Sequence, residues 1–374
     1  MKKLRVGHAG CGSVSIRGIL PHITQPDAQE HLELVAVCDV DGERARAVAD
    51  QFGAERSYNS FEELIQSDDI DMVIIATPIF LHAAQAEMAL RAGKHVYVNK
   101  SMALTLDEAD RVMQAVKDTG LKLVSAPGQM LAPSLSKIRE LVQKGDFGHM
   151  YWGFANNTGG GHGVEMYQSG NTSIRRDPTW YYKKPSGGPI YDMGVYSLHS
   201  VTGILGPVRR VTAMSGIVRN ERRFDDQVID VEMDDNTWMV LDFGHNCFVT
   251  VGAGLCHHGV HMYWGQLALY GSDGGVEISK LDDATGWPSE LRILRGGSEE
   301  LIQTPISEHP LLRGEHLTLP EPHIYVDIMH LVDCIRHERT PVASLEHARH
   351  VVEVIEKSYI AAHTGVAQQI TSTF

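Results

Sequence analysis

Short apolar runs alternate with longer segments of helical spacing through the first third of the chain. The apolar runs cover residues 4–9, 32–38, 72–76, 95–98 and 121–125, and the helical segments cover 42–52, 61–67, 81–91 and 106–119. A short run that is apolar throughout is typical of a strand buried on both faces. Strands and helices in alternation predict an α/β domain of Rossmann type, with a doubly wound parallel sheet, over residues 1–128.

The pattern changes after Pro127-Gly128, because strand-like stretches then follow one another with few helices between them. They cover 150–157, 210–218, 237–243, 247–252, 266–270, 275–279 and 291–294, with helical spacing near 133–145, 189–205, 323–337 and 344–363. This order predicts an α+β domain over residues 129–374, with a large, mostly antiparallel open sheet covered by helices on one face. The other face is available to a second subunit, and the last helix can pack back on the first domain.

Composition favours a cytoplasmic enzyme. The 374 residues carry a net charge of −14 without a strongly basic cluster, which argues against nucleic acids and anionic membranes as partners. No window approaches the roughly 18 consecutive apolar residues of a membrane span. The first strand has no secretory segment ahead of it, and the five scattered cysteines indicate reduced thiols.

The turn after the first strand has the spacing of a dinucleotide-binding loop. It reads Gly10-Cys11-Gly12-Ser13-Val14-Ser15 and leads into a segment that can form a helix. Gly10 permits a tight turn, Gly12 lets the backbone approach a pyrophosphate, and the helix N-terminus points its free N–H groups at that anion. Ser15 takes the position of the third glycine, where a small side chain is needed. Alone, the turn is equally compatible with a glycine turn that binds nothing.

Asp39, at the end of the second strand, favours the dinucleotide reading. It follows the turn at the distance where such domains place the carboxylate that accepts hydrogen bonds from the adenosine ribose hydroxyls. A 2′-phosphate would meet this negative charge, so we expect NAD rather than NADP. The nearby Arg44 and Arg46 leave NADP open as the alternative.

Three later motifs occur in order along the chain: Ala76-Thr77-Pro78 with His82, the segment 92–100 ending in Asn99-Lys100, and the segment 187–196. Together with the glycine turn they resemble the glucose-fructose oxidoreductase and inositol dehydrogenase family, Gfo/Idh/MocA. The resemblance implies a nicotinamide cofactor, sugars, cyclitols or their derivatives as substrates, and a homodimer or homotetramer. The residues expected to bind the cofactor are Gly10, Gly12, Ser13, Val14, Asp39, Ala76, Thr77, Pro78, His82, Asn99 and Lys100.

Lys100 matches the lysine of the family's Glu-Lys-Pro motif, which the resemblance implies contacts the reacting hydroxyl and the nicotinamide ribose. Here the motif reads Asn99-Lys100-Ser101. Loss of the glutamate removes a charge that could tune the lysine, and loss of the proline removes the usual reason for a cis bond. The alternative for Lys100 is a solvated residue at a strand end.

Asp192 matches the aspartate of the family's Asp-x-x-x-His motif, although Tyr196 takes the histidine position. In a helix over 190–204, Asp192, Tyr196 and His199 fall at i, i+4 and i+7 and line one face. A neutral His199 or a polarised Tyr196 could accept the alcohol proton, while Lys100 stabilises the alkoxide. The alternatives are a core histidine, a packing tyrosine and a helix N-terminal acid.

Substrate recognition is expected from the long irregular stretch 158–189 and from the start of the second domain. The candidate residues are Gln129, His162, Arg176, Trp180 and Tyr182. Rings beside polar donors suit a carbohydrate, although such a stretch can also be a surface or subunit-contact loop. No metal is expected at His257-His258-x-x-His261, because adjacent side chains of a strand point to opposite faces.

These features predict an NAD-dependent oxidoreductase that removes hydride from a secondary alcohol of a sugar, sugar acid, cyclitol or glycoside. One alternative is redox-neutral: NAD stays bound, oxidises the carbinol transiently and recovers the hydride after elimination or isomerisation, as in related glycosidases and oxidoisomerases. Another alternative is a nucleotide-sensing regulator without catalysis.

Overall fold

A computed structural model describes residues 2–158, 179–185, 187–224, 227–256, 265–282 and 285–374. The described residues form two compact units. The first contains residues 2–127 and 313–348, and the second contains the described parts of 128–312 together with 349–374. Residues 313–348, which the strand-rich pattern assigned to the second domain, therefore belong to the first unit. Tertiary packing decides this, because a helix in that segment packs on strands of the first sheet.

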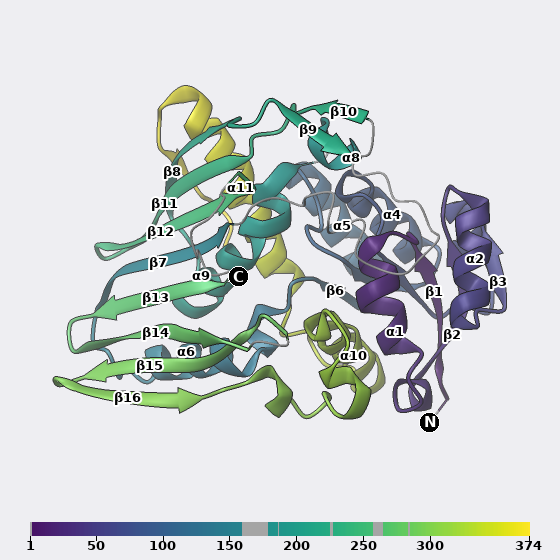
Figure 1. Ribbon diagram of the computed structural model, residues 1–374, viewed down its shortest axis with the longest axis horizontal. Helices are drawn as coiled ribbons and strands as arrows, with labels where there is room; N and C mark the ends of the chain where they lie inside the picture. Colours follow the sequence, from purple (N-terminus) through teal and green to yellow (C-terminus); the bar gives the residue numbers. More distant parts are fainter. Residues whose placement is uncertain (1, 159–178, 186, 225–226, 257–264, 283–284) are drawn as a thin grey trace. The chain divides into compact units, whose positions relative to one another are not determined.

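The first unit contains a six-stranded parallel sheet with the strand order β3-β2-β1-β4-β5-β6 (Figure 1). Its strands are β1 (Leu4–Ala9), β2 (Leu32–Cys38), β3 (Arg56–Tyr58), β4 (Met72–Ile75), β5 (His95–Val98) and β6 (Leu123–Ser125). The parallel α/β prediction is confirmed. Of these six strands, β3 alone was not predicted, because its three half-buried residues are too few to form an apolar run.

The helices of this unit have clear local signals at their ends. They are η1 (Ser15–Ile19), α1 (Leu20–Ile23), η2 (Ala28–Glu30), α2 (Gly42–Phe52), α3 (Phe61–Gln66), α4 (Ile79–Arg91), α5 (Leu106–Thr119), η6 (Gly314–Leu317) and α10 (Pro322–His337). Thr105 forms a capping box with Glu108 at the start of α5, and Gly120 ends that helix in the left-handed conformation. The helix α10 packs against β5, β6 and η1.

The second unit contains a nine-stranded sheet with the order β16-β15-β14-β13-β7-β12-β11-β8-β17. Its strands are β7 (Met150–Thr158), β8 (Arg210–Gly216), β11 (Asn236–Gly244), β12 (Cys247–Gly254), β13 (Gln266–Gly271), β14 (Gly274–Leu281), β15 (Pro288–Arg295), β16 (Ser298–Gln303) and β17 (Gln368–Gln369). Only β7 and β12 pair in parallel among these strands, so the mostly antiparallel sheet that the sequence predicts is confirmed.

Helices α6 and α9 pack on one face of this sheet (Figure 1). The remaining elements of the unit are η3 (Gln129–Leu131), α6 (Pro133–Gln143), α8 (Thr179–Tyr182), η4 (Ile190–Gly194), α9 (Val195–Leu205), the two-stranded sheet β9 (Glu221–Phe224) and β10 (Gln227–Asp230), η5 (Ile306–Glu308) and α11 (Leu345–Thr364). The cores of both units are built from the aliphatic side chains of the strands and the inner faces of these helices.

The outer face of the large sheet carries an apolar row across three neighbouring strands. Trp152 pairs in register with Phe248 on one side and Tyr270 on the other, and its ring stacks on Tyr270 with 4.9 Å between ring centroids. Trp152 is 48% exposed and Phe248 is 40% exposed. Three apolar side chains in a row on an open sheet face are unusual for a surface that stays in water.

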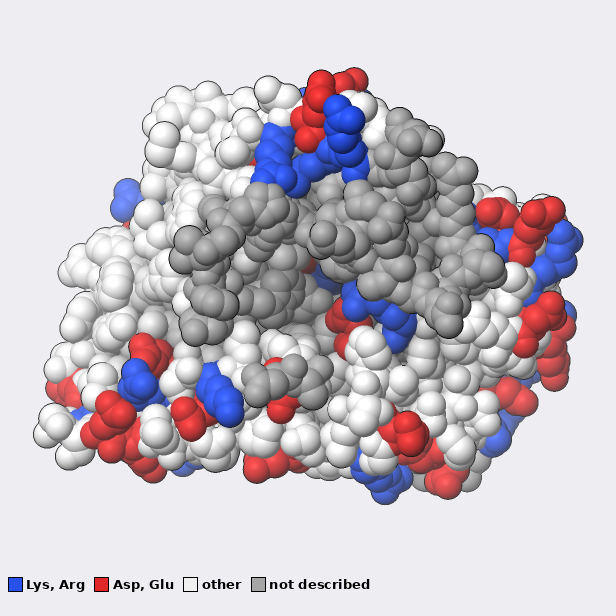
Figure 2. All heavy atoms as spheres, in the orientation of Figure 1, with Lys and Arg blue, Asp and Glu red and all other residues white. Residues whose placement is uncertain are grey.

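Ion pairs link several charged side chains on the strands at one edge of the large sheet. At the lower left of Figure 2, where β14 to β16 lie, blue and red groups are close together. Arg292 of β15 and Glu277 of β14 form an ion pair at 2.8 Å. Among the described residues, no helix has the length and apolar character needed to cross a membrane.

Candidate active site

The glycine turn at the end of β1 is shaped by a close backbone approach. Gly10 has a φ of +92°, and a Cβ on this residue would lie 2.5 Å from the carbonyl oxygen of Ala76. Its amide donates to the carbonyl of Cys38 at 2.8 Å. Gly12 differs, because an added Cβ would meet no heavy atom within 4 Å. The turn therefore leaves an open space beside Gly12, at the N-terminus of the first helix, where an anion can approach the backbone.

Ser15 ties this turn together from within the helix. Its hydroxyl donates to the carbonyl of Gly10 at 2.5 Å, and His8 Nε2 lies 2.9 Å from the same oxygen. Burial lowers the pKa of His8 to about 4, so the neutral ring donates through Nε2. Ser15 thus takes the position of the third glycine of the fingerprint and adds a buried hydrogen bond to the turn. Ser13 and Val14 form the first residues of the same helix.

Asp39 lies at the end of β2, beside the glycine turn. Its Oδ2 accepts from the amide of Cys11 at 2.8 Å, and its Oδ1 accepts from the amide of Asp41 at 3.0 Å. Arg44 Nη2 lies 3.2 Å from Oδ1. These contacts hold the carboxylate at the edge of the sheet, where the hydroxyls of a ribose can also donate to it. The open space at Gly12 and the fixed carboxylate together fit an NAD molecule.

Two further loops of the cofactor site follow β4 and β5 and are joined by His82. Its ring nitrogens lie 2.8 Å from the carbonyl of Thr77 and 2.8 Å from that of Ser101. Burial lowers the pKa of His82. Ala76 continues the ladder by donating to the carbonyl of Ala9, and Pro78 precedes α4. His82 thereby fixes the loop that carries the Ala-Thr-Pro motif against the loop that carries Lys100.

Lys100 directly follows β5 and Asn99. The side-chain oxygen of Asn99 accepts from the backbone amide of Lys100 at 2.8 Å. The peptide bond between Lys100 and Ser101 is cis, although the proline that would give the usual reason for it is absent.

The predicted helix over 190–204 exists, but its first turn is a π-turn. Residues Ile190–Gly194 form η4 and the α-helical part starts at Val195. A π-turn contains an extra residue, so Asp192 is not one regular turn away from Tyr196. The three candidate side chains accordingly have different neighbours.

Asp192 is held by a tyrosine that the sequence analysis passed over. The hydroxyl of Tyr181 donates to Asp192 Oδ2 at 3.1 Å, and both side chains are buried. Tyr181 lies in α8, at the end of the long irregular stretch. Tyr181 lies between Trp180 and Tyr182, which the sequence predicted as substrate residues, but only the fold reveals that the hydroxyl of Tyr181 reaches the carboxylate.

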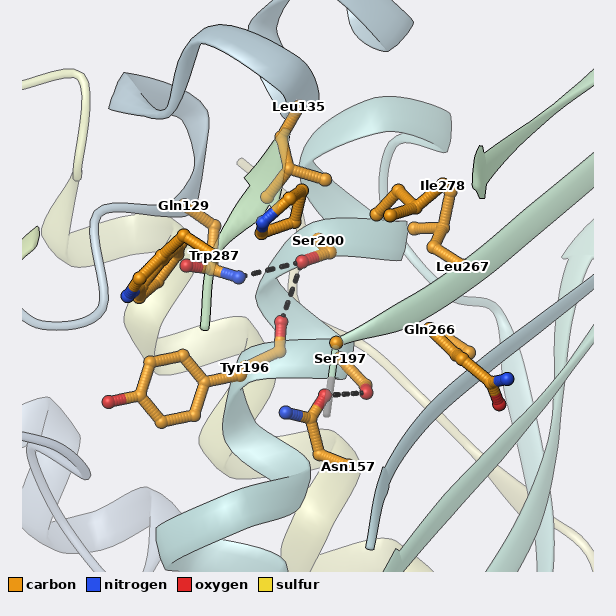
Figure 3. A pocket seen from close by; sticks show the side chains of 13 residues that line it. Gln129, Leu135, Asn157, Tyr196, Ser197, Ser200, Gln266, Leu267, Ile278 and Trp287 are labelled. Atoms are coloured by element: carbon orange, nitrogen blue, oxygen red, sulfur yellow. Dashed lines mark hydrogen bonds between the residues drawn. The ribbon is translucent and has the colours of Figure 1, made fainter. Parts of the chain in front are cut away.

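Tyr196 borders a small pocket within the second unit. Its ring meets Trp287 edge to face with 6.2 Å between centroids. Gln129 Nε2 donates to Ser200 Oγ at 2.9 Å, and that hydroxyl donates to the carbonyl of Tyr196 at 2.8 Å (Figure 3). The pocket has a volume of about 20 Å³, which is room for a water molecule. The amide of Gln129 is thus hydrogen-bonded to α9, and its role in substrate binding stays a prediction.

His199 is almost fully enclosed by the second unit. Burial, with a smaller contribution from nearby His350, lowers its pKa to about 3. Its imidazole is neutral at neutral pH but is a weak base, because an effective general base has a pKa near the working pH. This environment favours the core-histidine alternative over a role in accepting the proton.

The other predicted substrate residues divide into packed residues and residues that the structure does not describe. Tyr182 packs with Ile229, Val231 and Leu255, and Trp180 is partly buried against the same cluster. Arg222 lies over the Tyr182 ring at 5.5 Å from its centroid. His162, Arg176 and the group His257, His258 and His261 lie outside the described residues. Elsewhere in the described chain, no three His, Cys, Asp or Glu side chains cluster suitably for a metal ion.

Comparison with known proteins matches both units. A model described as "Oxidoreductase family, NAD-binding Rossmann fold" of GFO_IDH_MocA matches residues 4–126, and one described as "GFO/IDH/MocA C-terminal domain" matches residues 135–277.

Three individual relatives have between 20% and 31% sequence identity to this chain. The chain is 29% identical to a dTDP-3,4-didehydro-2,6-dideoxy-alpha-D-glucose 3-reductase of Streptomyces violaceoruber, over 81% of each chain. It is 31% identical to an uncharacterized oxidoreductase of Rhizobium meliloti, over 53% of this chain and 55% of that protein. The structure of a levoglucosan dehydrogenase in complex with NADH has a TM-score of 0.80 and 20% identity, covering 99% of this chain and 100% of the other.

Proposed function

The chain belongs to the Gfo/Idh/MocA oxidoreductase family, and from that premise we propose that it removes hydride from a secondary alcohol of a sugar, sugar acid, cyclitol or glycoside. It is an NAD-binding oxidoreductase of sugar-related substrates. We propose in addition the specific substrate class and the roles of the individual residues.

One observation carries the assignment of the residues. Along the sheet order β2-β1-β4-β5, the strand ends lead in turn to Asp39, Gly10, Thr77 and Lys100. The carboxyl ends of parallel strands share one edge, and these four strands span three strand spacings, about 14 Å. A dinucleotide laid along this edge has its adenosine ribose at Asp39, its pyrophosphate at Gly12 and its nicotinamide end toward Lys100.

When bound, NAD supplies the hydride acceptor. The residues of the chain supply positioning and charge. Gly12 and the helix N-terminus receive the pyrophosphate, and Asp39 accepts from the ribose hydroxyls. Because a 2′-phosphate would compete with Asp39 for Arg44, we propose NAD as the working cofactor and NADP as the weaker one.

The alcohol must lose its proton as hydride leaves the same carbon. We propose that the ammonium of Lys100 stabilises the developing alkoxide and that Asp192, oriented by Tyr181, binds a substrate hydroxyl. Of the remaining candidates we propose Tyr196, in its phenolate form, as the proton acceptor, because the low pKa of His199 makes that imidazole a poor base.

The test is NADH absorbance with purified protein, NAD and a panel of aldoses, sugar acids, inositols and glycosides. Lys100→Met is expected to lower kcat by about 100-fold or more on any substrate that reacts. Lys117→Met, which removes an exposed lysine of α5, serves as the matched control and should retain wild-type turnover.

Other outcomes separate the alternatives. Turnover of a glycoside without net NADH, by protein that retains NAD during purification, would replace the dehydrogenase with the redox-neutral reaction. NAD binding without turnover of any kind, unaffected by Lys100→Met, would favour a nucleotide-sensing regulator.

The exposed row formed by Trp152, Phe248 and Tyr270 supports a homo-oligomer in which a second copy covers the open sheet face. Trp152→Glu is expected to shift the mass measured by light scattering toward the monomer. Val342→Glu, at an exposed apolar residue of the first unit, is the control. A wild-type monomer would contradict the proposal.

All five cysteines are free, which supports the cytoplasm as the compartment.

A further inference from the structure

Two buried histidines of the first unit meet edge to edge. His22 lies in α1, which continues from the glycine turn through η1, and His316 lies in η6. Their Nδ1 atoms are 2.8 Å apart, and the two residues are 0% and 1% exposed. The ring planes differ by 2°, and the 5.1 Å between ring centroids equals the N···N distance plus one ring radius on each side. The two nitrogens therefore lie on the line between the ring centres, which is the geometry of an N–H···N hydrogen bond.

The outer nitrogen of each ring also has a partner, and both partners are acceptors. His22 Nε2 lies 3.0 Å from the carbonyl oxygen of Pro320, and His316 Nε2 lies 3.0 Å from Asp27 Oδ1. The same carboxylate oxygen accepts from the amide of Ala28 at 3.0 Å. A carbonyl oxygen and an ionised carboxylate have no hydrogen to donate. Three hydrogen bonds in series thus join Asp27, His316, His22 and Pro320, and we call these four residues the proton network.

The proton network needs one more proton than two neutral imidazoles carry. Each of its three contacts requires a hydrogen, and each neutral ring supplies one N–H. Burial lowers the pKa of His22 to about 4, although the Pro320 carbonyl and the charge of Glu321 oppose burial, so His22 is neutral near pH 7. Burial raises the pKa of Asp27, but its contacts, led by His316, outweigh burial and lower it, so the carboxylate is ionised. The third proton then belongs on His316, which donates through both nitrogens.

The other titratable groups around this ring are compatible with a cation there. Tyr325 of α10 has its ring 4.0 Å from that of His316, and burial raises the pKa of its hydroxyl, so it is a neutral phenol. Burial lowers the pKa of His323, also in α10, to about 4, so this ring is neutral near pH 7. Arg313 Nε lies 3.5 Å from Asp27 Oδ2, on an exposed side chain. The charge on His316 is therefore balanced by the carboxylate that it contacts directly.

We propose that His316, doubly protonated between Asp27 and His22, is a pH-sensitive latch that holds residues 313–320 on the first helix. Loss of the third proton leaves one contact without a hydrogen, so that either two nitrogen lone pairs face each other or one end of the network separates. Residues 313–320 lead into α10, which covers β5 and β6. The latch therefore ties the late segment of the nucleotide unit to the helix that follows the glycine turn. The competing interpretation is two neutral rings that only pack beside Tyr325.

The first test counts the protons on the two rings. Full-length protein labelled with ¹⁵N-histidine is studied by NMR at pH 7.5, where about one tenth of ordinary histidines are charged. We expect His316 to carry a proton on both nitrogens, His22 to carry one on Nε2 only, and a scalar coupling to join their Nδ1 atoms. The signals are identified by their loss in His22→Gln and His316→Gln.

Removal of the carboxylate is the matched perturbation. Asp27→Asn keeps the size of the side chain and its ability to cap η2 but removes the charge. We expect His316 to carry a single ring proton in this variant at pH 7.5. Glu30→Gln, which removes an exposed carboxylate from the same short helix, is the control and should retain the wild-type signals.

The second test asks whether the proton holds the segment in place. The amides of Thr318 and Leu319 donate to the carbonyl of Glu315 at 3.0 Å and 3.2 Å, so their hydrogen exchange reports on this segment. Exchange rates between pH 6 and pH 9 are divided by the intrinsic rate at each pH. Protection is expected to fall about tenfold or more over the interval in which NMR records loss of the third proton. Amides of α5 should keep their protection throughout.

The same exchange measurement separates the variants. Asp27→Asn should show the reduced protection already at pH 7.5, and Glu30→Gln should follow the wild type. A single ring proton on wild-type His316 at pH 7.5 would overturn the proton assignment. Protection that stays constant as the third proton leaves would overturn the latch and favour simple ring packing. Should Asp27→Asn fail to fold, the two wild-type titrations decide, and neither depends on the proposed reaction.

Discussion

Gly10 and Ala76 approach so closely that a Cβ on residue 10 would lie 2.5 Å from the Ala76 carbonyl oxygen. Two residues further on, a Cβ on Gly12 would touch nothing within 4 Å. The two glycines of one turn therefore have separate physical reasons. Gly10 is required by the fold of the chain itself, whereas we propose that Gly12 is required by the ligand that approaches it.

This difference predicts opposite results for two alanine substitutions. Gly10→Ala is expected to lower the free energy of unfolding by about 3 kcal/mol, from the positive φ and the backbone clash. Gly12→Ala should change stability by less than about 0.5 kcal/mol but weaken NAD binding about tenfold or more. Urea denaturation and calorimetric titration with NAD measure the two effects. Equal destabilisation by both variants would contradict this assignment.

Asp39 should set the preference between NAD and NADP. Asp39→Asn removes the charge that repels a 2′-phosphate and releases Arg44, which lies 3.2 Å from Oδ1. The ratio of the Kd for NADP to that for NAD is expected to fall about 10-fold to 100-fold. Glu43→Gln, at an exposed position in the first turn of α2, is the control. An unchanged ratio would mean that specificity is decided elsewhere.

Tyr181 should act through Asp192. Tyr181→Phe removes the hydroxyl that lies 3.1 Å from the carboxylate and leaves a buried acceptor with one donor fewer. We expect a loss of about 1 kcal/mol in the free energy of unfolding and a drop of about fivefold in kcat/KM. Tyr151→Phe, an exposed tyrosine of β7, should have neither effect. A change in stability with normal kinetics would reduce Tyr181 to a structural residue.

Buried histidines should make the protein sensitive to acid. Burial lowers the pKa of His8 to about 4 and that of His199 to about 3, whereas an unfolded chain has histidines near 6.5. The native state then binds fewer protons than the unfolded state. Stability is complete above about pH 6.5 and declines as pH falls toward 4, by about 2–3 kcal/mol for each residue at pH 4.5.

Replacement of one of these histidines tests that prediction. The free energy of unfolding, measured by urea denaturation at pH 7 and at pH 4.5, should fall between these two values by about 2–3 kcal/mol less in His199→Gln than in the wild type. His337→Gln, which removes an exposed histidine at the end of α10, should retain the wild-type loss. Identical pH dependence in His199→Gln and wild type would show that this residue does not govern acid sensitivity.

The features that sequence reasoning found are those encoded over short stretches. The turn at Gly10 and Gly12, the carboxylate at Asp39 and the lysine after β5 each follow directly from a strand and its next residues. The π-turn at Ile190–Gly194 was missed, because a regular period of 3.6 residues was assumed. The packing of α10 on β5 and β6 could not be found in this way, because only the tertiary fold brings these distant segments together.

The nucleotide unit is discontinuous, and this has a consequence for synthesis on the ribosome. Residues 2–127 emerge first, but α10, which covers β5 and β6, belongs to residues 313–348. Until that helix is made, the apolar surface of these two strands stays uncovered. A nascent chain therefore completes its first folding unit only after most of the second has been translated, and an isolated fragment ending at residue 128 would expose a patch that invites aggregation.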